Sequence, residues 1–335
     1  MKKILLIGGS GYIGSVVAKY FLSLGFNVRI LDNLLFNNNF STEDLNNNKN
    51  FDFINGDLCR LEDLEKSIEG ISDVIILGGI VGDPLSKKYP EETIKINYDG
   101  IKLCLNFLKN KNLKKVIFIS TCSNYGLTNN DQLIDENFPL NPLSIYAKTK
   151  VDIEKFILNN KDDFDFSPII LRFATAFGLS PRMRFDLTIN QFTNDLINND
   201  ILKVYDPDTW RPYCHVNDFA TILFKLLNIE DNKLRNQVFN VGSNNNNFTK
   251  RQIVELITTK IKNKCSIKYT GDGPDKRNYK INFNKINKFI DHKMVSVSDG
   301  VDEIIESINR KKFKDFFTNK NKYINFEINK WDLEI

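Results

Sequence analysis

The stretch that decides the fold is residues 3–32, which read KILLIGGSGYIGSVVAKYFLSLGFNVRILD. An apolar run of strand length opens it, a glycine-rich turn follows, and residues 15–24 then show the apolar spacing of a helix. Gly25 ends this helix, and residues 27–31 are typical of a second buried strand, which ends at Asp32. A strand, a glycine turn, a helix and a strand with a terminal carboxylate within about 30 residues form the arrangement that binds dinucleotides.

Each glycine of the turn has a physical role. Gly8 can turn the chain tightly, Gly11 lets backbone N–H groups approach a pyrophosphate, and Gly14 lets the helix pack close to the sheet. Asp32 is placed to accept hydrogen bonds from an adenosine ribose, and a 2′-phosphate there would meet a like charge, so NAD is favoured over NADP. The glycines also fit a 9, 11, 14 spacing, and the alternative interpretation of the motif is a tight strand–helix turn without a ligand.

The composition is that of an ordinary globular chain with one large or two closely fused domains. Its 335 residues are 41% hydrophobic and 26% charged, and 46 basic against 42 acidic side chains leave a net charge of +4. This small charge gives no reason to expect nucleic acid or an anionic membrane as a partner. Five scattered cysteines without metal-ligand spacing predict reduced thiols and no metal site. With neither a signal peptide nor a membrane-crossing stretch visible, we expect a cytoplasmic protein.

Strand-like and helical segments alternate through the first half of the chain. Strands are expected at 51–54, 73–77, 115–119 and 168–173, and helices at 61–69, 91–110 and 144–159. This alternation predicts an α/β fold with a Rossmann-like, doubly wound parallel sheet. The later segments are helices at 186–198, 217–228 and 250–263 and short strands at 202–205, 237–241 and 266–269. We therefore expect a cofactor domain of residues 1–178, to which 212–242 return, a smaller α/β substrate-binding lobe of 179–211 and 243–310, and a tail of 311–335.

Two strand ends carry further candidates. Asp57 follows the strand at 51–54, where it could bond the adenine amino group or cap the helix at 61–69. Gly78 and Gly79 follow the strand at 73–77, and their lack of a side chain permits close approach to a diphosphate.

The predicted catalytic groups are Tyr146, Lys150 and Thr121. Four residues apart on a helix, Tyr146 and Lys150 share a face, and an ammonium together with a positive nicotinamide favours the phenolate that takes a proton from a sugar hydroxyl. Tyr98 and Lys102 have the same spacing but precede the strand that ends at Thr121, so we interpret them as surface residues. Thr121 is expected to bond the substrate oxygen, the alternative being a turn or helix-cap threonine.

Several ordered motifs together carry a resemblance to a known family. They are Gly8-x-x-Gly11-x-x-Gly14, Asp32, Asp57-Leu58, Asn97, the segment 120–126, Tyr146-x-x-x-Lys150 and the run from Arg211 to Val216. Spanning roughly residues 3–300, they resemble the extended short-chain dehydrogenases/reductases of the nucleotide-sugar epimerase/dehydratase family, which include UDP-glucose 4-epimerases. The resemblance implies NAD as cofactor, a nucleotide-diphosphate sugar as substrate, and a homodimer formed through helices 91–110 and 144–159.

The resemblance also implies the remaining site residues. The expected cofactor contacts are Gly8, Gly11, Tyr12, Ile13, Gly14, Asp32, Asn33, Asp57, Leu58, Leu77, Gly78, Gly79, Asn97, Ser120, Tyr146, Lys150 and Phe173. The expected substrate contacts are Val81, Thr121, Cys122, Ser123, Thr175, Arg182, Met183, Leu187, Arg211 and Arg277. The three arginines suit a diphosphate because a guanidinium gives two parallel charge-assisted bonds, although each alone could be a surface residue. We expect His215 to be structural.

Departures from the family patterns narrow the expected chemistry. The 4,6-dehydratases carry an Asp-Glu pair directly after the catalytic threonine, where this chain has Cys122-Ser123, so dehydration is disfavoured. Other branches use a cysteine where this chain has Ser123, and we interpret Cys122 as a small buried residue rather than an acid. The reaction that these departures leave is hydride exchange at one carbinol of the sugar, which we expect to be carbon 4.

The sequences of residues 180–185 and 274–277 resemble those of a subgroup associated with surface-polysaccharide sugars, which includes oxidoreductases of nucleotide-linked heptoses. We therefore expect a 4-epimerase of a nucleotide-linked hexose or heptose. The alternatives are a 4-dehydrogenase or 4-ketoreductase and, in another class, a non-catalytic NAD-binding sensor or scaffold.

Overall fold

A seven-stranded, all-parallel sheet forms the centre of the molecule. The computed structural model describes residues 2–128, 132–262, 265–271, 273, 275–325 and 327–328, so the expected helix end at 263, Pro274 and tail residues 326 and 329–335 lie outside the described residues. The strand order is β11-β7-β5-β4-β1-β2-β3. The strands are β1 (Lys3–Ile7), β2 (Asn27–Asp32), β3 (Phe51–Asn55), β4 (Asp73–Ile76), β5 (Lys115–Thr121), β7 (Ser167–Phe173) and β11 (Gln237–Val241). The predicted α/β fold with a doubly wound parallel sheet is confirmed.

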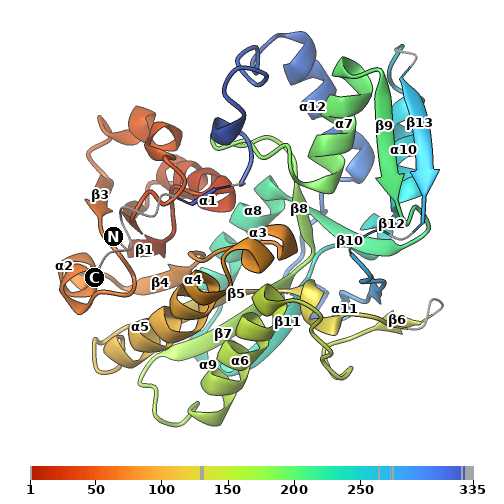
Figure 1. Ribbon diagram of the computed structural model, residues 1–335. Coiled ribbons are helices and arrows are strands. Elements are labelled where there is room, and N and C mark those ends of the chain that lie inside the picture. Colours follow the sequence, from red (N-terminus) through yellow and green to blue (C-terminus); the bar gives the residue numbers. More distant parts are fainter. Residues whose placement is uncertain are drawn as a thin grey trace.

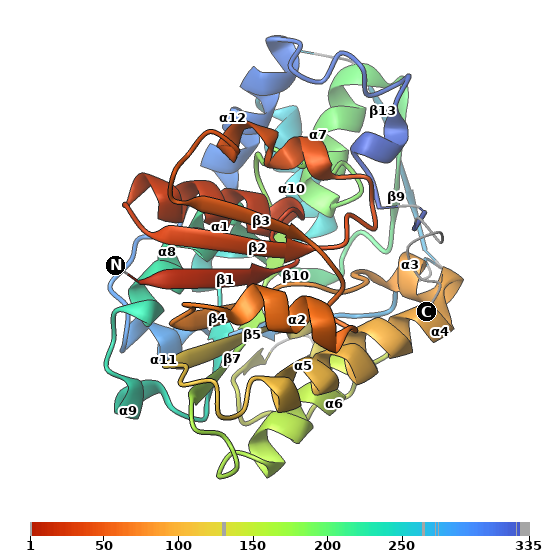
Figure 2. The same cartoon turned by 90° about the vertical axis from the view of Figure 1, so that its left-hand side faces the viewer.

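Helices cover both faces of this sheet. In Figure 2, α1 (Tyr12–Ser23) and α8 (Val216–Leu227) lie on one face, and α2 (Leu61–Ile68), α5 (Ile101–Phe107) and α6 (Ile145–Asn159) lie on the other. Successive side chains of a strand point to opposite faces, so Ile4 and Leu6 of β1 enter one buried hydrophobic cluster, and Leu5 and Ile7 enter a second. Burial on both faces explains why the strands are nearly continuous apolar runs in the sequence.

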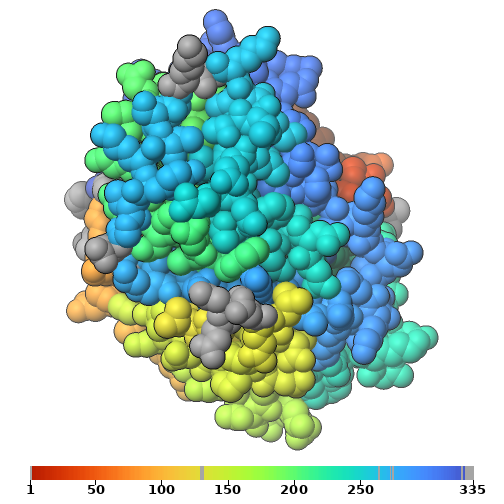
Figure 3. Space-filling view, turned by 90° about the vertical axis from the view of Figure 1, so that its right-hand side faces the viewer, coloured from red at the N-terminus to blue at the C-terminus, as the bar shows by residue number. Residues whose placement is uncertain are grey.

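A second group of elements packs against the carboxyl ends of the strands (Figure 1). Its helices are α7 (Thr188–Asn198), α10 (Lys250–Thr258) and α12 (Val297–Asn309). Its small sheets are β12 (Asn247–Thr249) with β10 (Trp210–His215) and β8 (Thr175–Phe177), and the parallel pair β9 (Ile201–Tyr205) and β13 (Ser266–Thr270). The remaining short elements are β6 (Leu133–Ile134), β14 (Lys280–Ile281), α9 (Asp231–Leu234) and α11 (Asn284–Asn287). Figure 3 shows the face that the cyan and blue residues after α8 form together with the yellow segment containing β6.

The helix predicted for 91–110 is wrong in its detail. The structure has α3 (Asp83–Lys88), α4 (Pro90–Ile94), a π-helical turn at Lys95–Gly100 and then α5. Local apolar spacing does not reveal the π turn, because a tertiary contact fixes it: the Asn97 side chain lies in this turn and bonds the backbone of Ile80.

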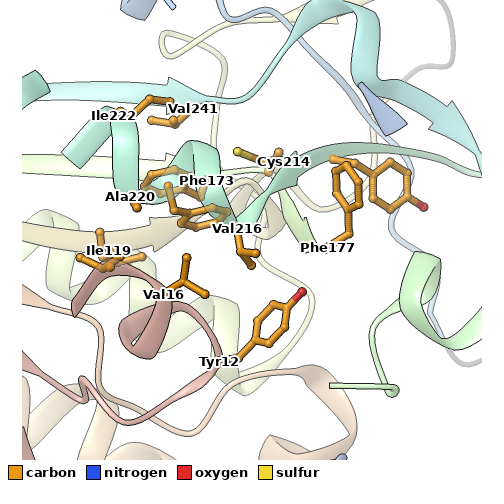
Figure 4. Close-up of a cluster of buried hydrophobic side chains, with 14 of the residues drawn as sticks. Tyr12, Val16, Ile119, Phe173, Phe177, Cys214, Val216, Ala220, Ile222 and Val241 are labelled. Atoms are coloured by element: carbon orange, nitrogen blue, oxygen red, sulfur yellow. The ribbon is translucent and has the colours of Figure 1, made fainter. Parts of the chain in front are cut away.

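A buried cluster joins the glycine turn to the second group of elements. Figure 4 shows Tyr12 and Val16 of α1 in one cluster with Ile119, Phe173 and Phe177, which belong to β5, β7 and β8. The Tyr12 hydroxyl donates a 2.6 Å hydrogen bond to the carbonyl oxygen of Gly178. The start of α1 is thereby fixed relative to both halves of the molecule. None of the helices in the described part of the chain combines the length and apolar character needed to cross a bilayer.

Candidate active site

One large pocket lies at the carboxyl edge of the central sheet. Its volume is about 870 Å³, and it is lined by the ends of β1, β2, β4, β5 and β7 and by residues of the second group of elements. The chain order reverses between β1 and β4, and the crevice beside such a reversal is where open α/β sheets bind ligands.

The glycine turn forms one wall of the pocket. Gly8 has a φ of +80°, and a Cβ there would collide with the Cα of Gly78, so position 8 requires glycine. Gly11 is the N-cap of α1 and supplies no side chain to bond the first N–H groups of the helix, and Tyr12 and Ile13 of this first turn line the pocket. These open donors and the positive end of the helix fit the pyrophosphate of a dinucleotide.

Two carboxylates stand beside the turn. Asp32 accepts hydrogen bonds of 2.9 Å from the backbone N–H groups of Ser10 and Leu34, and burial raises the pKa of its carboxyl. Asp32 thus holds the glycine turn while its carboxylate faces the pocket, where a ribose hydroxyl could donate to it. Asp57 accepts from the N–H of Cys59 at 2.8 Å and does not cap α2, which begins at Leu61, so the capping alternative is wrong.

The predicted catalytic groups meet at the end of β5. Ser144 caps α6 by accepting from the Ala147 N–H at 3.2 Å, and this start places Tyr146 in the first turn, where it lines the pocket. The Thr121 hydroxyl accepts a 3.1 Å hydrogen bond from the Ser123 N–H and so caps the turn that follows β5, and it lies close enough to Tyr146 to lower the pKa of the phenol. Lys150 lies one turn further along α6, and its Nζ donates to the carbonyl oxygen of Ile119 at 2.8 Å.

Burial dominates the electrostatics of this group. It raises the pKa of the Tyr146 phenol to about 12 and lowers the pKa of the Lys150 ammonium to about 7. The nearby Thr121 hydroxyl and the charge of Arg277 lower the phenol pKa, whereas the charge of Asp83 raises it. In the protein by itself, desolvation therefore disfavours both the Tyr146 phenolate and the Lys150 ammonium.

The second pair with this spacing lies outside the pocket. Tyr98 is half-buried, and the Lys102 Nζ lies 5.7 Å from its ring centroid and 5.4 Å from that of Phe156. This pair borders no strand end.

Most of the remaining predicted residues line the same pocket. On the cofactor side these are Gly14, Asn33, Leu58, Leu77, Gly79, Ser120 and Phe173. On the substrate side they are Val81, Ser123, Thr175, Arg182, Leu187 and Arg277.

The Arg277 guanidinium is held by a network of polar groups. Its Nη1 donates to the Ser123 hydroxyl at 2.7 Å, its Nε and Nη2 each bond Asp275 at 2.8 Å, and Asp83 Oδ2 lies 3.3 Å from Nη2. Arg277 therefore lies at the side of the pocket where Ser123 follows Thr121.

Four predicted residues lie behind the pocket wall, so direct contact with a ligand is not supported for them. Asn97 is buried, with its amide oxygen accepting from the Ile80 N–H at 2.7 Å and its amide nitrogen donating to the Ile80 carbonyl at 2.8 Å. Cys122 is buried and bonds the carbonyl of Arg172, and burial raises the pKa of its thiol, as suits a packing residue. Met183 is buried in the hydrophobic cluster.

Arg211, the fourth, is also buried behind the wall. Its guanidinium pairs with Asp275 at 3.0 Å and donates to the carbonyl oxygens of Trp210 and Arg277. It thus positions the segment that carries Arg277. His215 bonds Glu303 at 2.8 Å and caps α8, in keeping with a structural role.

Several polar pocket residues were missed by the sequence interpretation. Asp83, Arg184, Asp186 and Asn325 all line the pocket. A signal exists for Asp83, because Asp-Pro after Gly82 is a helix start. Arg184 and Asp186 form a bidentate ion pair, but nothing in the sequence places that pair in the pocket. Asn325 has no local signal, since its position depends on contacts with residues about 140 positions earlier.

Comparisons with known proteins agree with this geometry. The model of the NAD dependent epimerase/dehydratase family matches residues 4–242. A UDP-glucose 4-epimerase of Bacillus subtilis (strain 168) is 28% identical over 264 residues, covering 72% of this chain and 77% of that protein.

Solved structures show the same fold. A UDP-glucuronic acid 4-epimerase of Bacillus cereus, in complex with UDP-glucuronic acid and NAD, superposes with a TM-score of 0.83 at 23% identity, covering 92% of this chain and 99% of the other. A dTDP-glucose 4,6-dehydratase of Bacillus anthracis (strain Ames), in complex with NAD, gives 0.81 at 23% identity, covering 93% and 98%. Because epimerases and a dehydratase share the fold, the fold alone does not choose the reaction. The resemblance noted in the sequence is confirmed: the chain belongs to the NAD dependent epimerase/dehydratase family.

Proposed function

We propose that this protein is an NAD-dependent 4-epimerase of a nucleotide-linked hexose or heptose that serves surface-polysaccharide biosynthesis. The observation that carries the proposal is that Thr121, Tyr146 and Lys150 line the same pocket as the glycine turn and the Asp32 carboxylate. A hydroxyl, a phenol and an ammonium beside a dinucleotide site are suited to oxidation of a carbinol.

Each residue has a distinct role in the proposed reaction. NAD, when bound, supplies the acceptor for the hydride of carbon 4 and a positive charge beside the phenol. Tyr146 Oη accepts the proton of the carbon-4 hydroxyl, and Thr121 Oγ1 bonds the same oxygen and stabilises the phenolate. Lys150, fixed on Ile119, contributes a positive charge when protonated. Epimerisation needs the keto sugar to turn over in the pocket before Tyr146 returns the proton.

Two guanidinium groups support a nucleotide diphosphate as the anionic part of the substrate. Arg182 and Arg277 line the pocket, and both present planar forks that can hold phosphate oxygens. In the described part of the chain, Arg182 has hydrogen bonds only to neutral oxygens, so a phosphate would supply its counter-charge.

A 4-dehydrogenase or 4-ketoreductase is the alternative within this chemistry. The same three side chains serve it, and the two reactions differ only in whether the sugar turns over. Dehydration is disfavoured because Cys122 and Ser123 follow Thr121 where an elimination would need a carboxylate. A sensor or scaffold without turnover would not require the phenol of Tyr146.

Turnover assays on the NAD-loaded protein separate these functions. UDP- and GDP-linked hexoses and heptoses are incubated with it, and both sugar stereochemistry and NADH absorbance are followed. A 4-epimerase forms the C4 epimer without net NADH, whereas a dehydrogenase forms one NADH per ketone. Tyr146→Phe should lower kcat about 10²–10⁴-fold. The control Tyr98→Phe should keep full activity, and an active Tyr146→Phe protein would contradict the proposal.

We also propose that the 1–178 and 212–242 segments form the cofactor domain, and that a homodimer forms through 91–110 and 144–159. Ile94 on α4 is 47% exposed, and α4 and α5 pack beside α6, so these helices offer one continuous surface. Light scattering should give twice the chain mass, and Ile94→Lys should shift it toward the monomer.

A further inference from the structure

Residues 323–325 and 327–328, which follow α12 in the dark blue part of the chain in Figure 1, contribute Ile324 and Asn325 to the pocket wall, and we call them the strap. At its start, the Tyr323 carbonyl accepts a 2.8 Å hydrogen bond from the Phe185 N–H, and Tyr323 is buried in the same cluster as Phe185. At its end, Ile328 is buried in the other hydrophobic cluster, among residues of the central sheet and its helices. Between these two anchors, Ile324 and Asn325 line the pocket.

The strap bonds the one pocket arginine that has no carboxylate partner among the described residues. Arg182 as a whole residue is only 2% exposed, and its Nη2 donates to Asn325 Oδ1 at 2.9 Å and to the Ile324 carbonyl at 3.4 Å. Its Nη1 donates to the Met183 carbonyl at 3.1 Å. Burial and the charge of Arg184 lower the pKa of Arg182 to about 10. A buried cation with only neutral acceptors remains poorly compensated.

Asn325 also contacts the neighbouring ion pair. Its backbone N–H donates to Asp186 Oδ2 at 3.4 Å, and Asp186 holds the Arg184 guanidinium in a bidentate pair. The strap therefore occupies the polar patch formed by Arg182, Arg184 and Asp186. A phosphate oxygen is a better acceptor for a guanidinium than an amide oxygen, because it carries a negative charge and a phosphate can accept two parallel bonds from the guanidinium fork.

We propose that Asn325 is a residue of the substrate site whose amide oxygen accepts from Arg182 until a diphosphate takes its place. The strap therefore opposes diphosphate binding, and the bound diphosphate displaces the strap. This inference rests on the proposed function, since it takes the anionic group to be the diphosphate of a nucleotide sugar. The anchors at Tyr323 and Ile328 differ in kind. The first belongs to an aromatic cluster with Phe185, Phe313 and Phe316, whereas the second is accompanied by an exposed Lys88–Glu327 ion pair. The strap is thus expected to open from its Ile328 end.

Calorimetric binding of UDP, GDP and inorganic pyrophosphate to the NAD-loaded protein tests the inference. Asn325→Ala removes the competing acceptor and should tighten binding about 2- to 10-fold. Asn325→Asp places a carboxylate on Arg182 and should weaken binding about tenfold. The matched control is Asn321→Ala, an exposed asparagine before the strap, which should leave the affinity unchanged.

Amide hydrogen exchange gives a second readout that does not need turnover. The Asn325 N–H should exchange faster when UDP or GDP is added, because the strap is displaced. The inference would be overturned if the Asn325 N–H exchanged more slowly when UDP or GDP is added. It would also be overturned if Asn325→Ala bound the probes no more tightly than wild type, or if none of the three probes bound. Epimerisation is measured separately, so a strap that fails this test leaves the proposed reaction standing, and a protein without turnover can still show the competition.

Discussion

Lys150 Nζ lies 2.8 Å from the carbonyl oxygen of Ile119 and 4.6 Å from the ring centroid of Phe118, inside the protein. Glu154, one helical turn away, is the group whose charge raises the pKa of Lys150, while burial lowers that pKa to about 7. The ammonium is therefore held by a neutral carbonyl and an aromatic face. Its protonation depends on pH in the neutral range.

Lys150 should make the folding stability depend on pH. Its pKa is about 7 in the folded protein and 10.5 in an unperturbed lysine side chain, so between these values the unfolded chain binds more protons and stability rises with pH. Below pH 7 the full cost of burying the charge remains. The melting temperature of Lys150→Met relative to wild type should fall steadily from pH 7 to pH 10. A difference that stays constant over this range would contradict the assignment.

The buried Glu154–Arg172 pair should contribute strongly to folding stability. Both side chains are buried. Arg172 Nε and Nη2 donate hydrogen bonds of 3.0 and 2.6 Å to Glu154 Oε2, and the Ser120 hydroxyl and the Asn124 amide donate to the other carboxylate oxygen. Glu154→Gln leaves a buried guanidinium uncompensated and should cost about 3–5 kcal/mol in the free energy of unfolding, measured by denaturant titration. Adding Arg172→Met should recover part of the loss. If the double variant is as unstable as the sum of both changes, the coupling is absent.

Gly8 and Gly25 have the same φ and allow the effect of a positive φ to be separated from the effect of close packing. Gly8 and Gly25 both have a φ of +80°, but a Cβ at Gly8 meets Gly78, whereas a Cβ at Gly25 meets nothing within 4 Å. Gly25→Ala should cost about 1 kcal/mol from backbone strain alone. Gly8→Ala should cost clearly more and abolish NAD binding, as measured by calorimetry. Equal effects of the two changes would show that close packing on Gly78 is unimportant.

Asp83 should tune the base. Its charge raises the pKa of Tyr146, and it also lies 3.3 Å from Arg277, whose charge lowers that pKa. Asp83→Asn removes the negative charge that raises the pKa of Tyr146 and leaves the charge of Arg277 less compensated. The pKa of Tyr146 should therefore fall, and the acid limb of the kcat/KM profile should move to lower pH. Asp152→Asn, an exposed carboxylate of α6, is the control and should leave the profile in place. A shift to higher pH would show that Asp83 acts otherwise.

The sequence predicted the central sheet and much of the pocket, because the signals there are local. Strands buried on both faces are apolar runs, and Ser144 marks where α6 begins. Residues at strand ends, such as Asp32 and Thr121, then fall at one edge of the sheet without further information.

What the sequence did not predict depends on long-range contacts. The π turn around Asn97 exists because its amide bonds Ile80, and Arg211 is turned away from the pocket because it pairs with Asp275. The strap depends on Phe185 and Tyr323, which are far apart in the chain. These contacts leave no periodic pattern in the sequence, and Asn97 and Arg211 were assigned to direct ligand contact through the family resemblance.

The central claim is that hydride leaves carbon 4 of the sugar and returns to the same carbon while Tyr146 handles the proton. The most direct measurement uses a nucleotide sugar that the protein converts, deuterated at carbon 4, with mass spectrometry and NMR of the product. The account predicts a C4 epimer that retains deuterium at carbon 4 and a primary isotope effect on turnover. Deuterium lost to water, or incorporation of solvent deuterium at that carbon or a neighbouring one, would contradict it.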